Sequence, residues 1–238
     1  MGFFGIDLFG SSPRDDLVPV KLNVPYVSQN GMQECGIAST MMILKYFGVK
    51  KPDRQRIKRM SEIREGDGSI VYGLARALAS YELDITMTEP GKRASRRARK
   101  YLEECVKESG ETTEERHALV KAMREEAVKA GVKIETRVPS LDEVLNHLSQ
   151  GTVPLVGLNA YRLYYGSRDI GPHGVVVTGF DGENVIYHDP ASFFEKGDSK
   201  ATEKRFRKAM NDMHSIVIFA SRRKTKWIKG SSKKLAEH

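Results

Sequence analysis

The chain has 238 residues, of which 39% are hydrophobic, so it suits one domain with an insertion or two small domains. Its formal charge of +8 is concentrated in residues 92–100 and 222–238, which carry +6 each and leave −4 for the remainder. This distribution argues against a core built to bind nucleic acid. Two cysteines are too few for a disulfide framework, which favours a reducing, cytoplasmic location.

No apolar run reaches the roughly 18 residues of a membrane-spanning helix, and the N-terminus lacks the basic start of a secretory signal. Residues 1–18 contain a Gly-Ser-Ser-Pro breaker and predict an irregular arm. Residues 18–27 alternate apolar and polar side chains and predict a short strand or extended lead-in. Helices are then predicted over residues 35–47, 53–60 and 69–81, and a strand over 83–87.

Two of these helices carry more specific predictions. The first should end at Gly48 and bury Ile37, Met41, Leu44 and Phe47 as one stripe. The third should begin with Ser69 as its capping residue.

Residues 89–137 are strongly charged and favour helix, so we expect a helical insertion there. It should break near Gly110 and restart at a capping box formed by residues 112–115. Its basic run at 92–100 could bind an acidic partner or nucleic acid, although a solvated helix face is the simpler interpretation. The basic tail over 222–238 could bind such partners as well, although a mobile terminus is the simpler interpretation.

The remaining sequence predicts a helix over residues 140–150, strands over 153–158, 174–180, 185–188 and 215–220, and a helix over 202–213. Helices thus come first and an antiparallel sheet second, which is the order of an α+β fold. We expect one domain over residues 19–221 that includes the insertion.

Cys35 is the candidate nucleophile. It lies at the start of the first predicted helix, where unpaired backbone N–H groups and the helix dipole favour a thiolate. Gly36 follows it and leaves the backbone open to a substrate. Cys105 lies within the charged insertion and is interpreted as a structural cysteine.

His173 and Asp189 are the candidate base and its orienting carboxylate, and they lie at the two ends of the predicted hairpin. Pairing Phe180 with Val185 would put Asp189 on the wrong face of the sheet for His173. Either a bulge corrects the register or Asp189 lies just beyond its strand. The other histidines are interpreted as structural or solvated, with His188 the nearest rival.

An oxyanion needs hydrogen-bond donors, and two glutamines precede the cysteine. Gln29 could fold back beside the Cys35 N–H, and Gln33 is an equal competitor from the residues alone. Metal-ligand spacings such as Cys-X-X-Cys are absent, so we expect neither metal nor other cofactor.

Four segments together resemble the papain-like cysteine peptidases that cut double-glycine leaders from bacteriocin precursors, and their stand-alone relatives. These segments are residues 24–29, 35–38, 173–177 and 188–190. The resemblance implies Gln29 as oxyanion donor in preference to Gln33, Cys35 as nucleophile, His173 as base and Asp189 as orienter. It also implies a papain-like fold and a peptide or protein substrate, cut through a thioester.

Two other functions remain open from the sequence. One is an acyl or peptidyl transferase that uses the same residues, in which an amine or thiol replaces water. The other is a catalytically silent module that binds peptide or nucleic acid. The segment 89–137 and the missing transporter region distinguish this chain from the leader peptidases, and the oligomeric state is not predicted.

Overall fold

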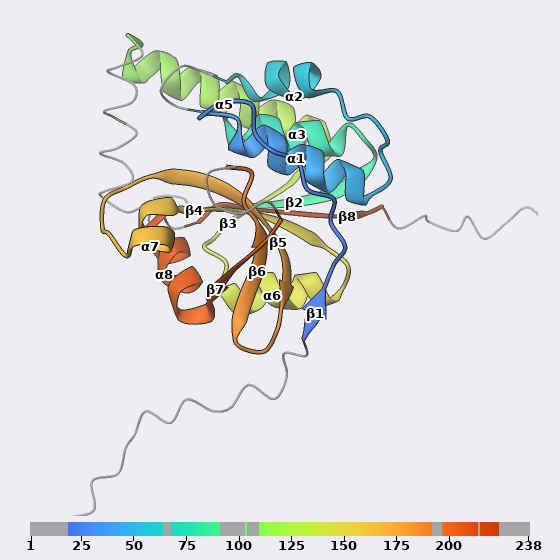
Figure 1. Ribbon diagram of the computed structural model, residues 1–238. Coiled ribbons are helices and arrows are strands. Elements are labelled where there is room, and N and C mark those ends of the chain that lie inside the picture. Colours follow the sequence, from blue (N-terminus) through green and yellow to red (C-terminus); the bar gives the residue numbers. More distant parts are fainter. Residues whose placement is uncertain are drawn as a thin grey trace, which may run out of the picture.

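A computed structural model describes residues 19–63, 68–90, 103, 110–191, 197–213 and 215–223 (Figure 1). The predicted arm over 1–18, the basic run over 92–100, Cys105 and nearly all of the basic tail lie outside these residues. Within them, no helix is long and apolar enough to cross a membrane.

Within the described residues, eight strands form one sheet in the order β3-β2-β8-β4-β5-β6-β7, with β1 paired to β5. Every pair is antiparallel except β2 with β3. The strands are β1 Val20–Lys21, β2 Leu83–Glu89, β3 Lys133–Thr136, β4 Val153–Asn159, β5 Pro172–Phe180, β6 Asn184–His188, β7 Asp198–Thr202 and β8 Val217–Arg222. The sheet is therefore mixed, and β3 and β7 are strands that the sequence analysis did not predict.

Helices cover both faces of the sheet (Figure 1). One layer contains α1 Cys35–Tyr46, α2 Arg54–Ser61, α3 Val71–Ala79 and α5 Thr113–Lys129. The other contains α6 Leu141–Ser149, α7 Ala160–Tyr165 and α8 Glu203–Met213. Each layer packs a separate apolar core against the sheet. The predicted α+β class is confirmed.

Helix α1 begins at Cys35 and ends before Gly48, as predicted. The predicted stripe is wrong in part, because Met41 and Phe47 are only partly buried. Most of the helix from Gly36 to Leu44 is buried, since α1 lies between the sheet, α2 and α3. The predicted cap of α3 is also wrong, because Ile70 precedes the helix and makes no side-chain cap bond.

The described part of the insertion is attached firmly to the domain. Its helix α5 begins at the predicted capping box of Thr112. The carboxylate of Glu89 accepts hydrogen bonds from Tyr72 at 2.6 Å, Arg124 at 2.9 and 3.1 Å and Thr136 at 2.9 Å. One carboxylate thus joins α3, α5, β2 and β3. The outer limits of the insertion stay a prediction.

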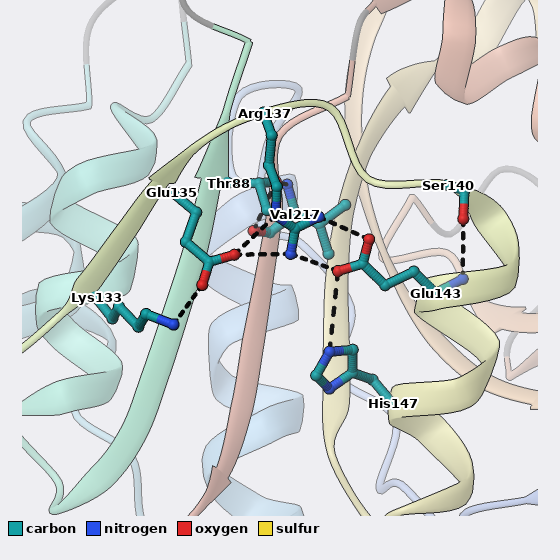
Figure 2. Close-up of polar contacts among 8 residues, drawn as sticks. All are labelled: Thr88, Lys133, Glu135, Arg137, Ser140, Glu143, His147 and Val217. Atoms are coloured by element: carbon teal, nitrogen blue, oxygen red, sulfur yellow. Dashed lines mark hydrogen bonds and ion pairs between the residues drawn. The ribbon is translucent and has the colours of Figure 1, made fainter.

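A second cluster of polar side chains joins the end of β3 to the start of α6 (Figure 2). Arg137 binds the carboxylate of Glu143 with both terminal nitrogens, at 2.6 and 2.5 Å, and also reaches Glu135 at 2.8 Å. The hydroxyl of Ser140 accepts a bond from the Glu143 N–H at 3.1 Å and caps α6. These contacts fix the segment between β3 and α6, where the predicted insertion ends and the rest of the domain continues.

The contact between α2 and α3 leaves no room for a side chain at Gly73. A Cβ there would lie 2.0 Å from the Met60 carbonyl oxygen. Alanine normally stabilises a helix by about 1 kcal/mol relative to glycine. We expect Gly73→Ala to destabilise the protein by about 3 kcal/mol instead, because the backbones must separate.

Urea denaturation followed by circular dichroism measures this effect. Gly31→Ala is the matched control, since a Cβ at Gly31 would meet nothing within 4 Å. An unfolding free energy of Gly73→Ala equal to or above that of the wild type would contradict the described packing.

Candidate active site

Cys35 is the first residue of α1 and is half-buried. The residue before it, Glu34, is buried, and its carboxylate lies 2.6 Å from both Arg54 and Lys58 of α2. Burial would raise the pKa of Glu34, but the hydrogen bonds and charges of Lys58 and Arg54 outweigh it and lower that pKa. Helix α2 therefore holds the loop that presents Cys35 and neutralises the negative charge beside it.

The hairpin of β5 and β6 contains a bulge. Phe180 pairs with Val185, as the sequence analysis assumed. The register then shifts between Val177 and Gly179, so that one residue of β5, Thr178, has no partner in β6. The carbonyl of this residue accepts a hydrogen bond from the Leu22 N–H at 2.7 Å, next to strand β1.

The bulge puts His173 and Asp189 on the same face. Beyond it, Val176 pairs with His188, the last residue of β6. One further step places Asp189 opposite Val175, which shares a face with His173 because side chains alternate along a strand. Both solutions that the sequence left open therefore hold, since the bulge is present and Asp189 lies just past its strand.

His173 and Asp189 form a close pair. His173 Nε2 lies 2.7 Å from Asp189 Oδ1, and the aspartate is fully buried. Asp189 Oδ1 also accepts the Ala191 N–H at 2.7 Å. Because Nε2 is directed to the aspartate, Nδ1 is the ring nitrogen left for Cys35.

The thiol of Cys35 interacts with the His173 ring. Burial alone would raise the pKa of Cys35, but the hydrogen bond and charge of His173, with the N–H groups of Gly174 and Gly36, lower it. Burial would likewise lower the pKa of His173, but Asp189 and Cys35 raise it to about 10. The pair therefore favours a thiolate and an imidazolium.

Gly174 of β5 lies next to Cys35. A Cβ at Gly174 would lie 3.9 Å from Cys35 Sγ and 3.8 Å from the Gly36 nitrogen. The Ser39 hydroxyl of α1 donates to the Gly174 carbonyl at 3.2 Å. The two Cβ distances are ordinary van der Waals distances, and the Ser39 bond joins α1 to the start of β5 beside Cys35.

Sequence reasoning missed Tyr164, whose hydroxyl donates a hydrogen bond to Asp189 Oδ2. Burial and the negative charge of Asp189 raise the pKa of this tyrosine far above its usual range, so it stays a donor. It comes from α7, a helix of six residues without a side-chain cap bond. No pattern in the sequence predicted that helix.

The backbone of Gln29 contacts the residue that follows Asp189. Its N–H donates to the carbonyl of Pro190, the residue after Asp189, at 2.9 Å. Its side-chain Nε2 donates to the Gly31 carbonyl at 2.8 Å, and its Oε1 is buried with no hydrogen-bond partner among the described residues. Gln33 lies on the same loop, and its backbone carbonyl oxygen is 3.7 Å from the position that a Cβ of Gly68 would occupy.

The nearest rival histidine has a structural environment. His188 is buried, its Nε2 lies 2.7 Å from the Val24 carbonyl, and its ring packs against that of Tyr26 in a T-shaped arrangement. Among the residues that the structure describes, no group of three or more His, Cys, Asp or Glu side chains could hold a metal ion.

Removing the cations beside Glu34 should change the reactivity of Cys35. In Arg54→Met, a buried carboxylate next to the thiolate loses a partner, so we expect the pKa of Cys35 to rise. The rate of iodoacetamide labelling against pH measures that pKa. The double variant Glu34→Gln/Arg54→Met should restore it, and an unchanged pKa in Arg54→Met would contradict this role of α2.

Residues 24–228 match the Peptidase C39-like family. A crystal structure assigned as a C39-like peptidase from Bacillus anthracis is 16% identical, with a TM-score of 0.52, and the match covers 87% of this chain and 100% of that chain. The search of curated proteins finds no match.

Two further solved structures are also similar. A double glycine motif protease from an AMS/PCAT transporter, in complex with the leader peptide, is 19% identical with a TM-score of 0.46, covering 85% of this chain and 96% of that one. The peptidase domain of Streptococcus ComA, a bifunctional ABC transporter, is 13% identical with a TM-score of 0.45, covering 82% and 96%.

The family match spans most of the chain, and the Bacillus anthracis structure shares its fold. The resemblance drawn from the sequence is therefore confirmed, and this chain belongs to the Peptidase C39-like family with a papain-like fold.

Proposed function

We propose that this protein is a cysteine peptidase that hydrolyses a peptide or amide bond through a thioester on Cys35. One observation carries the proposal. Cys35, His173 and Asp189 come from a helix start, a strand start and a strand end far apart in sequence, yet they form one continuous chain of contacts. The family supports a peptide as substrate.

In the proposed reaction, the Cys35 thiolate attacks the carbonyl carbon and forms a tetrahedral intermediate. The His173 imidazolium gives its proton to the leaving amine as the C–N bond breaks, which leaves a thioester. His173 then takes a proton from water, whose oxygen attacks the thioester. The acid product leaves and the Cys35 thiolate returns, so the cycle is balanced.

The negative oxygen of the intermediate needs donors. The Cys35 N–H is in the first turn of α1, where backbone N–H groups have no partner within the helix. Gln29 is the proposed second donor, because a side-chain amide has two hydrogens and the Gly31 carbonyl occupies only one. Losing one such donor typically costs about 3 kcal/mol of transition-state stabilisation.

A peptide library tests the proposal. The full chain and its Cys35→Ala variant are incubated with peptides that include double-glycine sequences, and products are read by mass spectrometry. Hydrolysis by the wild type alone is expected. Products joined to an added amine, without hydrolysis, would instead support an acyl or peptidyl transferase.

Tyr164 acts as a positioning residue in this scheme, because its hydroxyl binds Asp189, which in turn orients His173. We expect Tyr164→Phe to lower kcat about tenfold, since a hydrogen bond to a charged group is worth about 1.5–3 kcal/mol. The pH profile of kcat should also shift, which a merely structural residue would not cause. Tyr165→Phe is the control because that ring is 67% exposed, and equal effects of the two variants would contradict the role.

A further inference from the structure

A basic hollow of about 370 Å³ lies where α7 meets α8 and the end of β7. Among the described residues that line it, four are cationic and none is acidic. The lining is Arg162, Gly166, Thr202, Lys204, Arg205 and Lys208. The volume falls in the usual range of ligand sites, and the charge would favour an anion.

The two arginines are held in place. Arg162 Nε lies 2.6 Å from Asp212, and its Nη1 donates to the Gly166 carbonyl at 3.0 Å. Arg205 Nη2 donates to the Tyr164 carbonyl at 3.2 Å. Each guanidinium has five N–H donors, so several remain for a ligand.

The two lysines keep their charge available. Lys204 and Lys208 are exposed and one turn apart on α8, and in the described part of the chain neither forms an ion pair. The acids nearest to them along α8 contact arginines instead. Glu203 lies 2.5 Å from Arg207, and Asp212 contacts Arg162.

We propose that this hollow binds an acidic segment of the peptide substrate, and this use of it rests on the proposed peptidase function. The hollow shares α7 with the site, since Arg205 holds the Tyr164 carbonyl while the Tyr164 hydroxyl holds Asp189. Several separate cations around an open hollow suit a run of carboxylates. In the part of the lining that the structure describes, there is no aromatic side chain on which a nucleic-acid base could stack.

Fluorescence anisotropy with labelled hexaglutamate tests the proposal. The chain carries Cys35→Ala, so the readout needs no catalysis and is independent of the proposed reaction. Lys204→Gln/Lys208→Gln should weaken binding about tenfold, which is about 1.4 kcal/mol. Lys50→Gln/Lys51→Gln removes the same charge from exposed lysines elsewhere and should change the Kd less than twofold.

Both variants keep the two basic sequence segments, so any contribution from those segments cancels. Equal weakening in the two variants would overturn the proposal, because net charge would then explain the binding. Absence of hexaglutamate binding would also overturn it. A labelled oligothymidine of equal charge is the last comparison. The proposal would also be overturned if the oligothymidine bound more tightly than hexaglutamate and lost affinity only in the Lys204→Gln/Lys208→Gln variant.

Discussion

His173→Ala is expected to lower kcat/KM by at least about 10³-fold, with little change in the fold. General acid–base catalysis typically contributes about 10²–10⁴-fold, and this residue would serve as acid in one step and base in the next. Its removal also takes away the main interactions that lower the pKa of Cys35, while burial of the thiol remains. The loss of the acid–base group and the rise in the Cys35 pKa both lower kcat/KM.

His188→Ala is the informative control for that variant. His188 is equally part of the hairpin, but its Nε2 lies 2.7 Å from the Val24 carbonyl, in the segment that follows β1. Its loss should lower the unfolding free energy by about 1–3 kcal/mol and leave kcat/KM of the folded protein nearly unchanged. Comparable activity losses in both variants would contradict the assignment of His173.

Asp189→Asn is expected to lower kcat about 10²–10⁴-fold, a range like that of other enzymes with such an orienting carboxylate. The buried carboxylate accepts bonds from His173, Ala191 and Tyr164. An amide oxygen can keep the first two, and its NH₂ group can donate to the Tyr164 oxygen. The structure should therefore survive while the negative charge beside the imidazolium is lost.

The pH dependence of this variant follows from the sign of that charge. Asp189 raises the pKa of His173, so its replacement by asparagine should lower that pKa and destabilise the ion pair with Cys35. Steady-state kinetics with circular dichroism as a folding check measure both effects. Asp169→Asn, at an exposed aspartate, is the matched control, and a loss under tenfold at Asp189 would contradict its role.

Local sequence patterns predicted much of the fold. The helix start at Cys35 and its end before Gly48 follow from a breaker and an apolar run. The capping box at Thr112 correctly marks the start of α5. The parallel pairing of β2 with β3 could not be predicted, because its partners are about fifty residues apart and depend on the Glu89 contacts.

In the candidate site, too, local patterns predicted some features and long-range contacts determined others. Residue types and spacing indicated Cys35, His173 and Asp189, but the face of Asp189 depended on a bulge fixed by pairing with the N-terminal lead-in. Tyr164 escaped prediction because its short helix has no capping signal.

The neutralising cations of Glu34 were missed for a different reason. Arg54 and Lys58 read as ordinary surface charges of an amphipathic helix. Only the packing of α2 beside α1 brings them to the carboxylate.

Cys35 is expected to be a thiolate paired with a protonated His173. The rate of Cys35 alkylation by iodoacetamide against pH tests it most directly, read by peptide mass with Cys105 as internal control. We expect fast labelling at neutral pH, with a midpoint below the ordinary thiol pKa of about 8.5, and a midpoint above that value in His173→Ala. Labelling of Cys35 no faster than that of Cys105, with the same pH profile in both proteins, would contradict it.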